Sequence, residues 1–116
     1  MPTSDLANKE CVPCKGGVPP LDETERAKLL TQLGPNGWEV VDGHHLAKEY
    51  KFPDFVSALA FVNKVGAVAE AQGHHPDLEL GWGRVVISVW THKIDGLTES
   101  DFVLAAKCDR ELGART

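Results

Sequence analysis

Histidines and carboxylates gather between residues 70 and 101 of this chain. His74 and His75 are adjacent, His92 follows them, and Glu70 and Asp101 flank the group. Imidazole is the only side chain whose ordinary pKa lies near neutrality, so such a cluster can donate and accept protons in one turnover without a metal or an organic cofactor. The pattern predicts acid–base chemistry, provided that the fold brings these side chains together.

Composition limits the class of protein. The chain has 116 residues and a formal net charge of −5, which fits one compact acidic domain. Nucleic-acid affinity depends on clustered Lys and Arg, so direct DNA binding is not expected. The N-terminus shows no basic stretch followed by an apolar one, and no segment is long and apolar enough to span a membrane. We expect a soluble cytoplasmic protein, with a nuclear pool left open.

Residues 1–20 are expected to form an irregular N-terminal arm, and residues 21–116 to form the domain. Cys11 and Cys14 have the spacing of a zinc knuckle or a redox pair, but a structural zinc needs four ligands and the chain has no second pair. A zinc site shared by two chains stays open. Cys108 is expected to act as a small buried hydrophobe on a helix.

The first half of the domain predicts a helix and a hairpin. A capping-box pattern at Asp22 opens the helix, which Gly34 ends. Residues 38–41 and 46–52 then read as strands joined by Asp42-Gly43, a dipeptide that tolerates the positive φ of a tight turn. The next residues, His44-His45, are expected to be solvated and to lie outside the site.

A long apolar segment leads to the histidine pair. Pro53 and Asp54 suit the first turn of a helix, Gly73 suits its C-terminal cap, and Pro76 prevents its continuation. The histidines therefore emerge just past the helix end, where the dipole favours imidazolium. Apolar residues every three to four positions predict one buried stripe, made of Phe55, Leu59, Val62, Val65 or Gly66, and Ala69.

A second hairpin and a last helix follow. Apolar residues alternate in 78–82, up to Trp82, and again in 85–91, whose strand is expected to end at His92. Trp82 is expected in the core or at its rim. Thr98-Glu-Ser-Asp101 is a capping-box pattern that opens a helix to about Leu112. Asp101 can therefore cap this helix and also serve the site.

The predicted order of elements is αββαββα. Two hairpins separated by a helix favour an α+β two-layer sandwich, with one four-stranded antiparallel sheet and the helices on one face. Val86, Ser88 and Trp90 would then lie on the open face, where Trp90 is a candidate for subunit or partner contact. A homo-oligomer is expected.

The spacing of His74-His75-Pro76, Trp82, His92 and Asp101, with Glu70 ahead of them, resembles the signature of the pterin-4a-carbinolamine dehydratases. The similarity spans roughly residues 21–112. It implies the same fold, a homodimer that can pair into a homotetramer, and dehydration of a 4a-hydroxytetrahydropterin to the quinonoid dihydropterin with no redox cofactor. Members of this family also serve as dimerisation cofactors of a transcription factor, so the resemblance implies a protein partner as an alternative role.

Site roles follow from the same resemblance. It makes His75 and His92 the main acid–base candidates and His74 a residue that positions substrate or shares a proton; which one is the acid stays open. Glu70 is expected to orient an imidazole of the pair, and Asp101 to do so beside His92. The implied pterin-binding set is Glu70, His74, His75, Pro76, Thr91, His92, Lys93, Ile94 and Asp101, without a metal.

Two other functions compete with this one. A binding module would recruit a protein through the open sheet face or Trp90. A metal-dependent hydrolase would use one histidine of the pair, His92 and a carboxylate as ligands, although no HExxH spacing supports it. The physiological pterin is not determined by the sequence.

Overall fold

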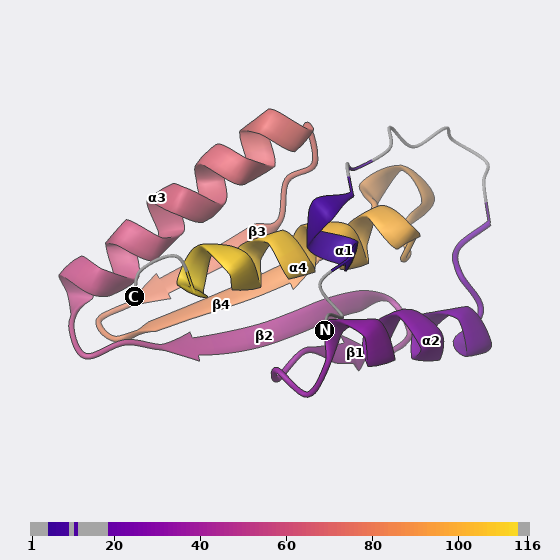
Figure 1. The fold of residues 1–116 in the computed structure, drawn as a ribbon, viewed down its shortest axis with the longest axis horizontal. Coiled ribbons are helices and arrows are strands. Elements are labelled where there is room, and N and C mark those ends of the chain that lie inside the picture. The colour runs from indigo at the N-terminus through magenta and orange to yellow at the C-terminus, as the bar shows by residue number, and fades with distance from the viewer. Residues whose placement is uncertain (1–4, 10, 12–18, 114–116) are drawn as a thin grey trace.

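The computed structural model describes residues 5–9, 11 and 19–113 (Figure 1). Cys14, and with it the Cys11–Cys14 spacing, lies outside the described residues. The elements are α1 (Asp5–Asn8), α2 (Glu23–Leu33), β1 (Glu39–Val41), β2 (His45–Lys51), α3 (Phe55–Gln72), β3 (Asp77–Gly81), β4 (Arg84–Val89), the short 3₁₀ turn η1 (His92–Ile94) and α4 (Glu99–Gly113).

The strands form one antiparallel sheet in the order β1-β2-β4-β3, with the helices over one face (Figure 1). On β4, Val85, Ile87 and Val89 are fully buried beneath the helices, whereas Val86 and Ser88 are only half-buried on the opposite face. The predicted two-layer α+β sandwich and its face assignment are confirmed. None of the described helices is long and apolar enough to cross a membrane.

Local signals place the first hairpin and the helix ends. Asp42 and Gly43 both adopt positive φ, 55° and 64°, as the predicted turn between β1 and β2 requires. The Asp22 side chain accepts from the Glu25 N–H, and the Glu25 side chain accepts from the Asp22 N–H, so the predicted capping box is confirmed. Asp54 lies outside α3 as its N-cap, and its carboxylate accepts from the Ser57 N–H.

The buried stripe of α3 agrees with the predicted one at Val65 and Ala69 but differs from it nearer the start of the helix. Phe55 and Leu59 are exposed, and the buried positions are Ala58, Phe61, Val65 and Ala69. Phe61 determines which side of α3 faces the sheet. Its ring packs against the ring of Tyr50, on β2, and against that of Phe52, just after β2. The helix is apolar on most sides, so its periodicity alone could not decide which side faces the sheet.

The second hairpin also departs from expectation at both ends. Trp82 lies at the turn between β3 and β4 with 71% of its surface exposed, so it belongs neither to the core nor to its rim. The following Gly83 approaches the backbone closely: an added Cβ would lie 2.7 Å from the Phe52 carbonyl oxygen. At the other end β4 stops at Val89, and His92 begins η1 rather than ending the strand.

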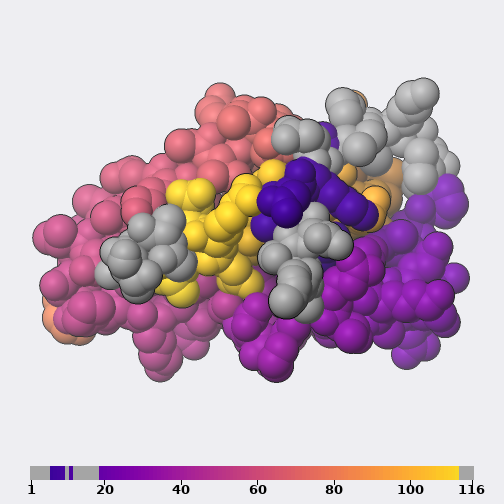
Figure 2. Space-filling model, in the orientation of Figure 1, coloured from indigo at the N-terminus to yellow at the C-terminus, as the bar shows by residue number. Residues whose placement is uncertain are grey.

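Part of the predicted irregular arm is described, and it includes a short helix. Residues 5–8 form α1, which lies across α4 (Figure 2). Leu6 is fully buried in the core, and the buried ammonium of Lys107 donates to the Ala7 carbonyl at 2.9 Å. The predicted domain boundary near residue 20 stays a prediction, but the described part of the arm packs on the domain.

A partly buried polar cluster links α4 to the sheet away from the histidines. The carboxylate of Asp109 accepts from Trp38 Nε1 at 3.0 Å, from Lys48 Nζ at 2.8 Å and from the Tyr50 hydroxyl at 2.6 Å. Burial, and then the neighbouring Asp109 carboxylate, raise the pKa of Tyr50 well above its usual range. Burial likewise raises the pKa of Cys108, which is fully buried as predicted.

Candidate active site

The end of α3 determines the direction in which the chain leaves the helix toward His74 and His75. Gly73 adopts the left-handed conformation, with φ 64° and ψ 27°. The Gly73 N–H donates to the Glu70 carbonyl and the His74 N–H donates to the Ala69 carbonyl, which together form a Schellman motif. The chain therefore turns sharply out of the helix, and His74 and His75 follow the turn as predicted.

His74 pairs with a buried carboxylate. Its Nε2 lies 2.6 Å from Oδ1 of Asp101, whose side chain is 0% exposed. The other oxygen, Oδ2, accepts from the Thr98 N–H and from the Thr91 hydroxyl, each at 2.8 Å. Asp101 thus caps α4 and holds an imidazole at once. Its imidazole partner is His74, not His92 as expected, because α4 begins next to the end of α3.

His75 pairs with the other predicted carboxylate. Its Nε2 lies 2.6 Å from Oε1 of Glu70, which stands on the last turn of α3. Both side chains are exposed, so solvent screens this pair far more than the His74–Asp101 pair. The adjacent imidazoles therefore point to different partners on different helices. Because an ionised carboxylate only accepts hydrogen bonds, Nε2 is the donor in each pair.

His92 comes from the loop after β4. Thr91 pairs with Gly96 as an isolated bridge, so the intervening residues of η1 form a closed loop. The His92 ring packs edge-on against Trp90, with ring centroids 4.5 Å apart. Since the buried Thr91 hydroxyl donates to Asp101, the loop that carries His92 is tied to the carboxylate that holds His74.

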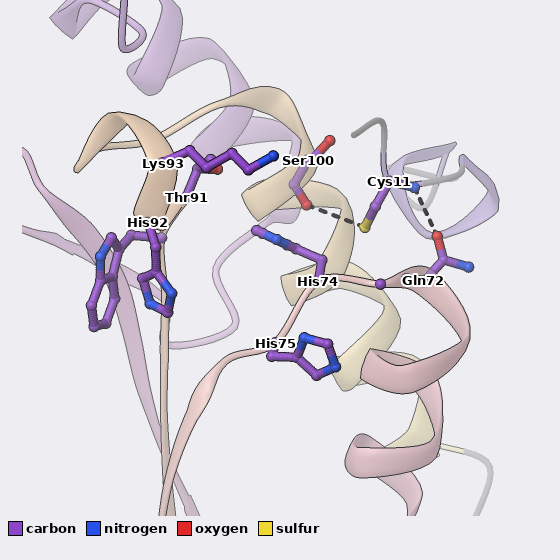
Figure 3. A pocket seen from close by; sticks show the side chains of 10 residues that line it. Cys11, Gln72, His74, His75, Thr91, His92, Lys93 and Ser100 are labelled. Atoms are coloured by element: carbon purple, nitrogen blue, oxygen red, sulfur yellow. Dashed lines mark hydrogen bonds between the residues drawn. The ribbon is translucent and has the colours of Figure 1, made fainter. Parts of the chain in front are cut away.

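One cavity of about 320 Å³ receives all three imidazoles (Figure 3). Of the predicted pterin-binding residues, His74, His75, Thr91, His92 and Lys93 line it. Glu70 and Asp101 do not line it but hold two of the lining histidines, and Pro76 and Ile94 lie outside the lining. The remaining lining residues are Cys11, Gln72, Gly73, Trp90 and Ser100.

Several of these lining residues were missed by the sequence reasoning. Gln72 and Ser100 adjoin predicted site residues in the chain, so helix geometry alone could have suggested them. Cys11 gave no such signal, because it is far along the chain from the other residues that line the cavity.

Within the described residues, no group of three or more His, Cys, Asp or Glu side chains is arranged to hold a metal ion.

The second histidine pair is not solvated as expected. His44 and His45 are half-buried, and both rings pack on Trp90, with centroids 5.3 Å and 5.8 Å from it. His44 Nε2 also lies 2.6 Å from the Asp95 carboxylate, at the end of η1. This pair does not line the cavity, but it supports the tryptophan on which His92 rests.

The fold and this cavity define a small α+β domain with an imidazole-lined pocket, and known proteins share both the sequence and the fold. The family profile described as pterin 4 alpha carbinolamine dehydratase matches residues 19–111. A relative from Rubrobacter xylanophilus is 64% identical over 92% of this chain and 98% of its own length. One from Rickettsia bellii is 56% identical over 92% and 94%. Both names assign the activity of a pterin-4-alpha-carbinolamine dehydratase provisionally.

Solved structures agree. A transcriptional coactivator/pterin dehydratase from Brucella melitensis matches with a TM-score of 0.74 at 33% identity, over 79% of this chain and 97% of that one. A pterin dehydratase-like protein, described as a RuBisCO assembly factor of the alpha-carboxysome, shares the fold with a TM-score of 0.59 at 23% identity, over 68% and 93%. The chain belongs to the pterin-4-alpha-carbinolamine dehydratase family, as its histidine signature predicted.

Proposed function

We propose that this protein dehydrates 4a-hydroxytetrahydropterin to the quinonoid dihydropterin, in the recycling of tetrahydrobiopterin for aromatic amino acid hydroxylation. One observation carries the proposal: three imidazoles from two separate segments line a single cavity, in a chain of the dehydratase family. The cavity volume lies at the low end of the range that is typical of small-molecule sites, which suits a bicyclic ring.

The chemistry needs two proton transfers. The C4a–O bond breaks, the hydroxyl group takes up a proton and leaves as water, and the N5 proton departs as the C4a=N5 double bond forms. Hydroxide is a poor leaving group, so an acid must protonate it while a base receives the N5 proton. Imidazoles suit both tasks, and the reaction needs neither an oxidant nor a reductant.

We assign the two transfers to His75 and His92. They reach the cavity from different elements, one after α3 and one after β4, so they can address different atoms of the ring. His74 is held by the buried Asp101, which suits a residue that positions the pterin or shares a proton. Thr91 and Lys93 complete the pocket edge, while Glu70 and Asp101 orient imidazoles.

A dehydration assay tests this assignment. His75→Ala and His92→Ala should each lower the rate about 10²–10⁴-fold, the usual value of a positioned proton donor or acceptor. Lys28→Ala, an exposed change on α2, should keep the wild-type rate. Circular dichroism confirms that each variant is folded. Two folded histidine variants with wild-type rates would refute the proposed chemistry.

The outer side of α3 supports self-association into a homodimer or homotetramer. Val56 is 75% exposed there, and Phe55 and Leu59 are also exposed. Exposed apolar side chains grouped on one helix mark a contact surface for another protein. Val56→Lys should lower the solution mass measured by light scattering, while Lys64→Glu, a charge change on the same helix, should leave it unchanged. A monomeric wild-type protein would refute the assembly.

A protein-binding role is the second candidate, because the name of the Brucella structure joins a coactivator to a dehydratase. It would act through a partner protein, since the chain is acidic. The two functions are compatible. A His75→Ala, His92→Ala double variant that loses dehydration yet still binds the partner would separate them, and a wild-type chain that binds no transcription factor would exclude the second.

A further inference from the structure

The described N-terminal segment, residues 5–9 and 11, reaches the cavity although it precedes the family match. The match begins at residue 19, yet Cys11 lines the same cavity as the three imidazoles. Figure 3 shows Cys11 and Gln72 on one side and His92 on the other, with His74 and His75 between them. Among the described residues of this segment, Cys11 is the one that borders the space among the histidines.

Buried contacts fix the segment in place. Leu6 is fully buried in the core, and Lys107, itself buried, donates to the Ala7 carbonyl. An exposed pair, Lys9 with Glu99, adds a further contact to the start of α4 at 2.7 Å. Since an ammonium is buried only where its donors find acceptors, the position of α1 on α4 is specific rather than adventitious.

Cys11 contacts both the end of α3, after which His74 follows, and the start of α4, which carries Asp101. Its backbone N–H donates to Oε1 of Gln72, the last residue of α3, at 2.7 Å. Its thiol lies 3.6 Å from the carbonyl oxygen of Ser100, in the first turn of α4. The segment thus spans the junction from which His74 and Asp101 meet.

We propose that this segment forms a wall of the pterin pocket, with Cys11 facing the ligand and Gln72 as the residue that positions the wall. The inference rests on the proposed pterin dehydration. The proposal has a specific consequence. Because the wall limits the space available to the pterin, the size of the side chain at position 11 determines how well the pterin binds. The proton transfers remain with the imidazoles.

A size series at position 11 tests this wall. Cys11→Ser keeps the volume and should leave KM and kcat within about twofold of wild type, whereas Cys11→Phe should raise KM at least about 10-fold, as steric changes in a fitted pocket do. The kcat of Cys11→Phe should change far less than its KM. Asn8→Phe is the matched control, because Asn8 is exposed on the same segment and does not line the cavity.

Ligand protection provides a second readout that needs no turnover. Iodoacetamide labelling is followed for each cysteine by peptide mass spectrometry, with and without saturating 7,8-dihydrobiopterin, a pterin that lacks the 4a-hydroxyl. The pterin should slow alkylation of Cys11 severalfold, and it should not slow alkylation in an Asn8→Cys variant at residue 8. The buried Cys108 should stay unlabelled in the folded protein.

The outcomes separate this wall from the dehydratase proposal. A wild-type protein without dehydratase activity contradicts the proposed function. An active wild-type protein whose KM is unchanged by Cys11→Phe, or raised equally by Asn8→Phe, contradicts the wall alone. Equal alkylation of Cys11 with and without bound pterin contradicts it as well; if Cys11 does not react with iodoacetamide, the size series decides.

Discussion

The carboxylate of Asp101, on α4, and the imidazole of His74, just past the end of α3, meet at 2.6 Å. The same carboxylate caps α4 through the Thr98 N–H. A single fully buried side chain therefore serves the stability of the fold and the geometry of the pocket.

Asp101→Asn should affect both. The amide keeps one acceptor oxygen but loses the charge, so at least one of the bonds to His74, Thr91 and Thr98 weakens. We expect the free energy of unfolding in urea to fall by about 1–3 kcal/mol. The pH–rate profile should also change, because His74 loses its anionic partner. Glu99→Gln, an exposed change in the same turn, is the control; an unaltered profile would restrict Asp101 to capping.

Trp90→Leu should lower kcat through His92. The indole supports the His92 ring from one side and is itself packed by His44 and His45. We expect a loss of about 10-fold, smaller than the loss for His92→Ala, since the imidazole remains but is less well positioned. The double variant should lose no more than His92→Ala alone. Additive losses would mean that Trp90 acts independently of His92.

Alkaline pH should destabilise the fold through Tyr50. Its pKa is raised by burial and by Asp109, so the folded state keeps the proton where the unfolded state releases it. The stability that comes from keeping the Tyr50 hydroxyl protonated is fully present below the unfolded pKa of about 10 and is lost as the pH rises above that value. Between about pH 10 and 11, the free energy of unfolding should therefore fall less steeply for Tyr50→Phe than for wild type. Equal slopes for both proteins would contradict this account.

Chelation should leave dehydration intact. The proposed proton transfers use imidazoles alone, so protein prepared with excess EDTA should retain its wild-type rate within about twofold. The rate is measured before and after treatment, together with the metal content of the sample. Loss of activity that zinc restores would favour the metal-hydrolase alternative over acid–base chemistry.

Local sequence signals predicted the helix ends that position the site residues. Gly73 and Pro76 end α3 ahead of the histidine pair, and the Thr98–Asp101 pattern opens α4, because both depend on residues a few positions apart. The alternation along β4 likewise identified its buried face. These features need no knowledge of distant contacts.

The misplaced features all depend on tertiary packing. The rotation of α3 follows from the contact of Phe61 with Tyr50, which no periodicity in an apolar helix reveals. The choice of His74 as the partner of Asp101, and the place of Cys11 beside the cavity, depend on how α1 and α3 dock against α4. His44, just before β2, contacts Trp90, just after the neighbouring strand β4, although the two residues are far apart in the chain.

The left-handed turn at Gly73 also relates assembly to reactivity. Both histidines directly follow this residue, so the position of the end of α3 determines where both of them leave the helix. At its other end, the first turns of the same helix present Phe55, Val56 and Leu59 to solvent. A neighbouring subunit that docks there and shifts α3 along its axis would displace both imidazoles relative to His92, which lies in the loop after β4. Such docking would change the spacing of the proposed proton donor and acceptor without contacting either one.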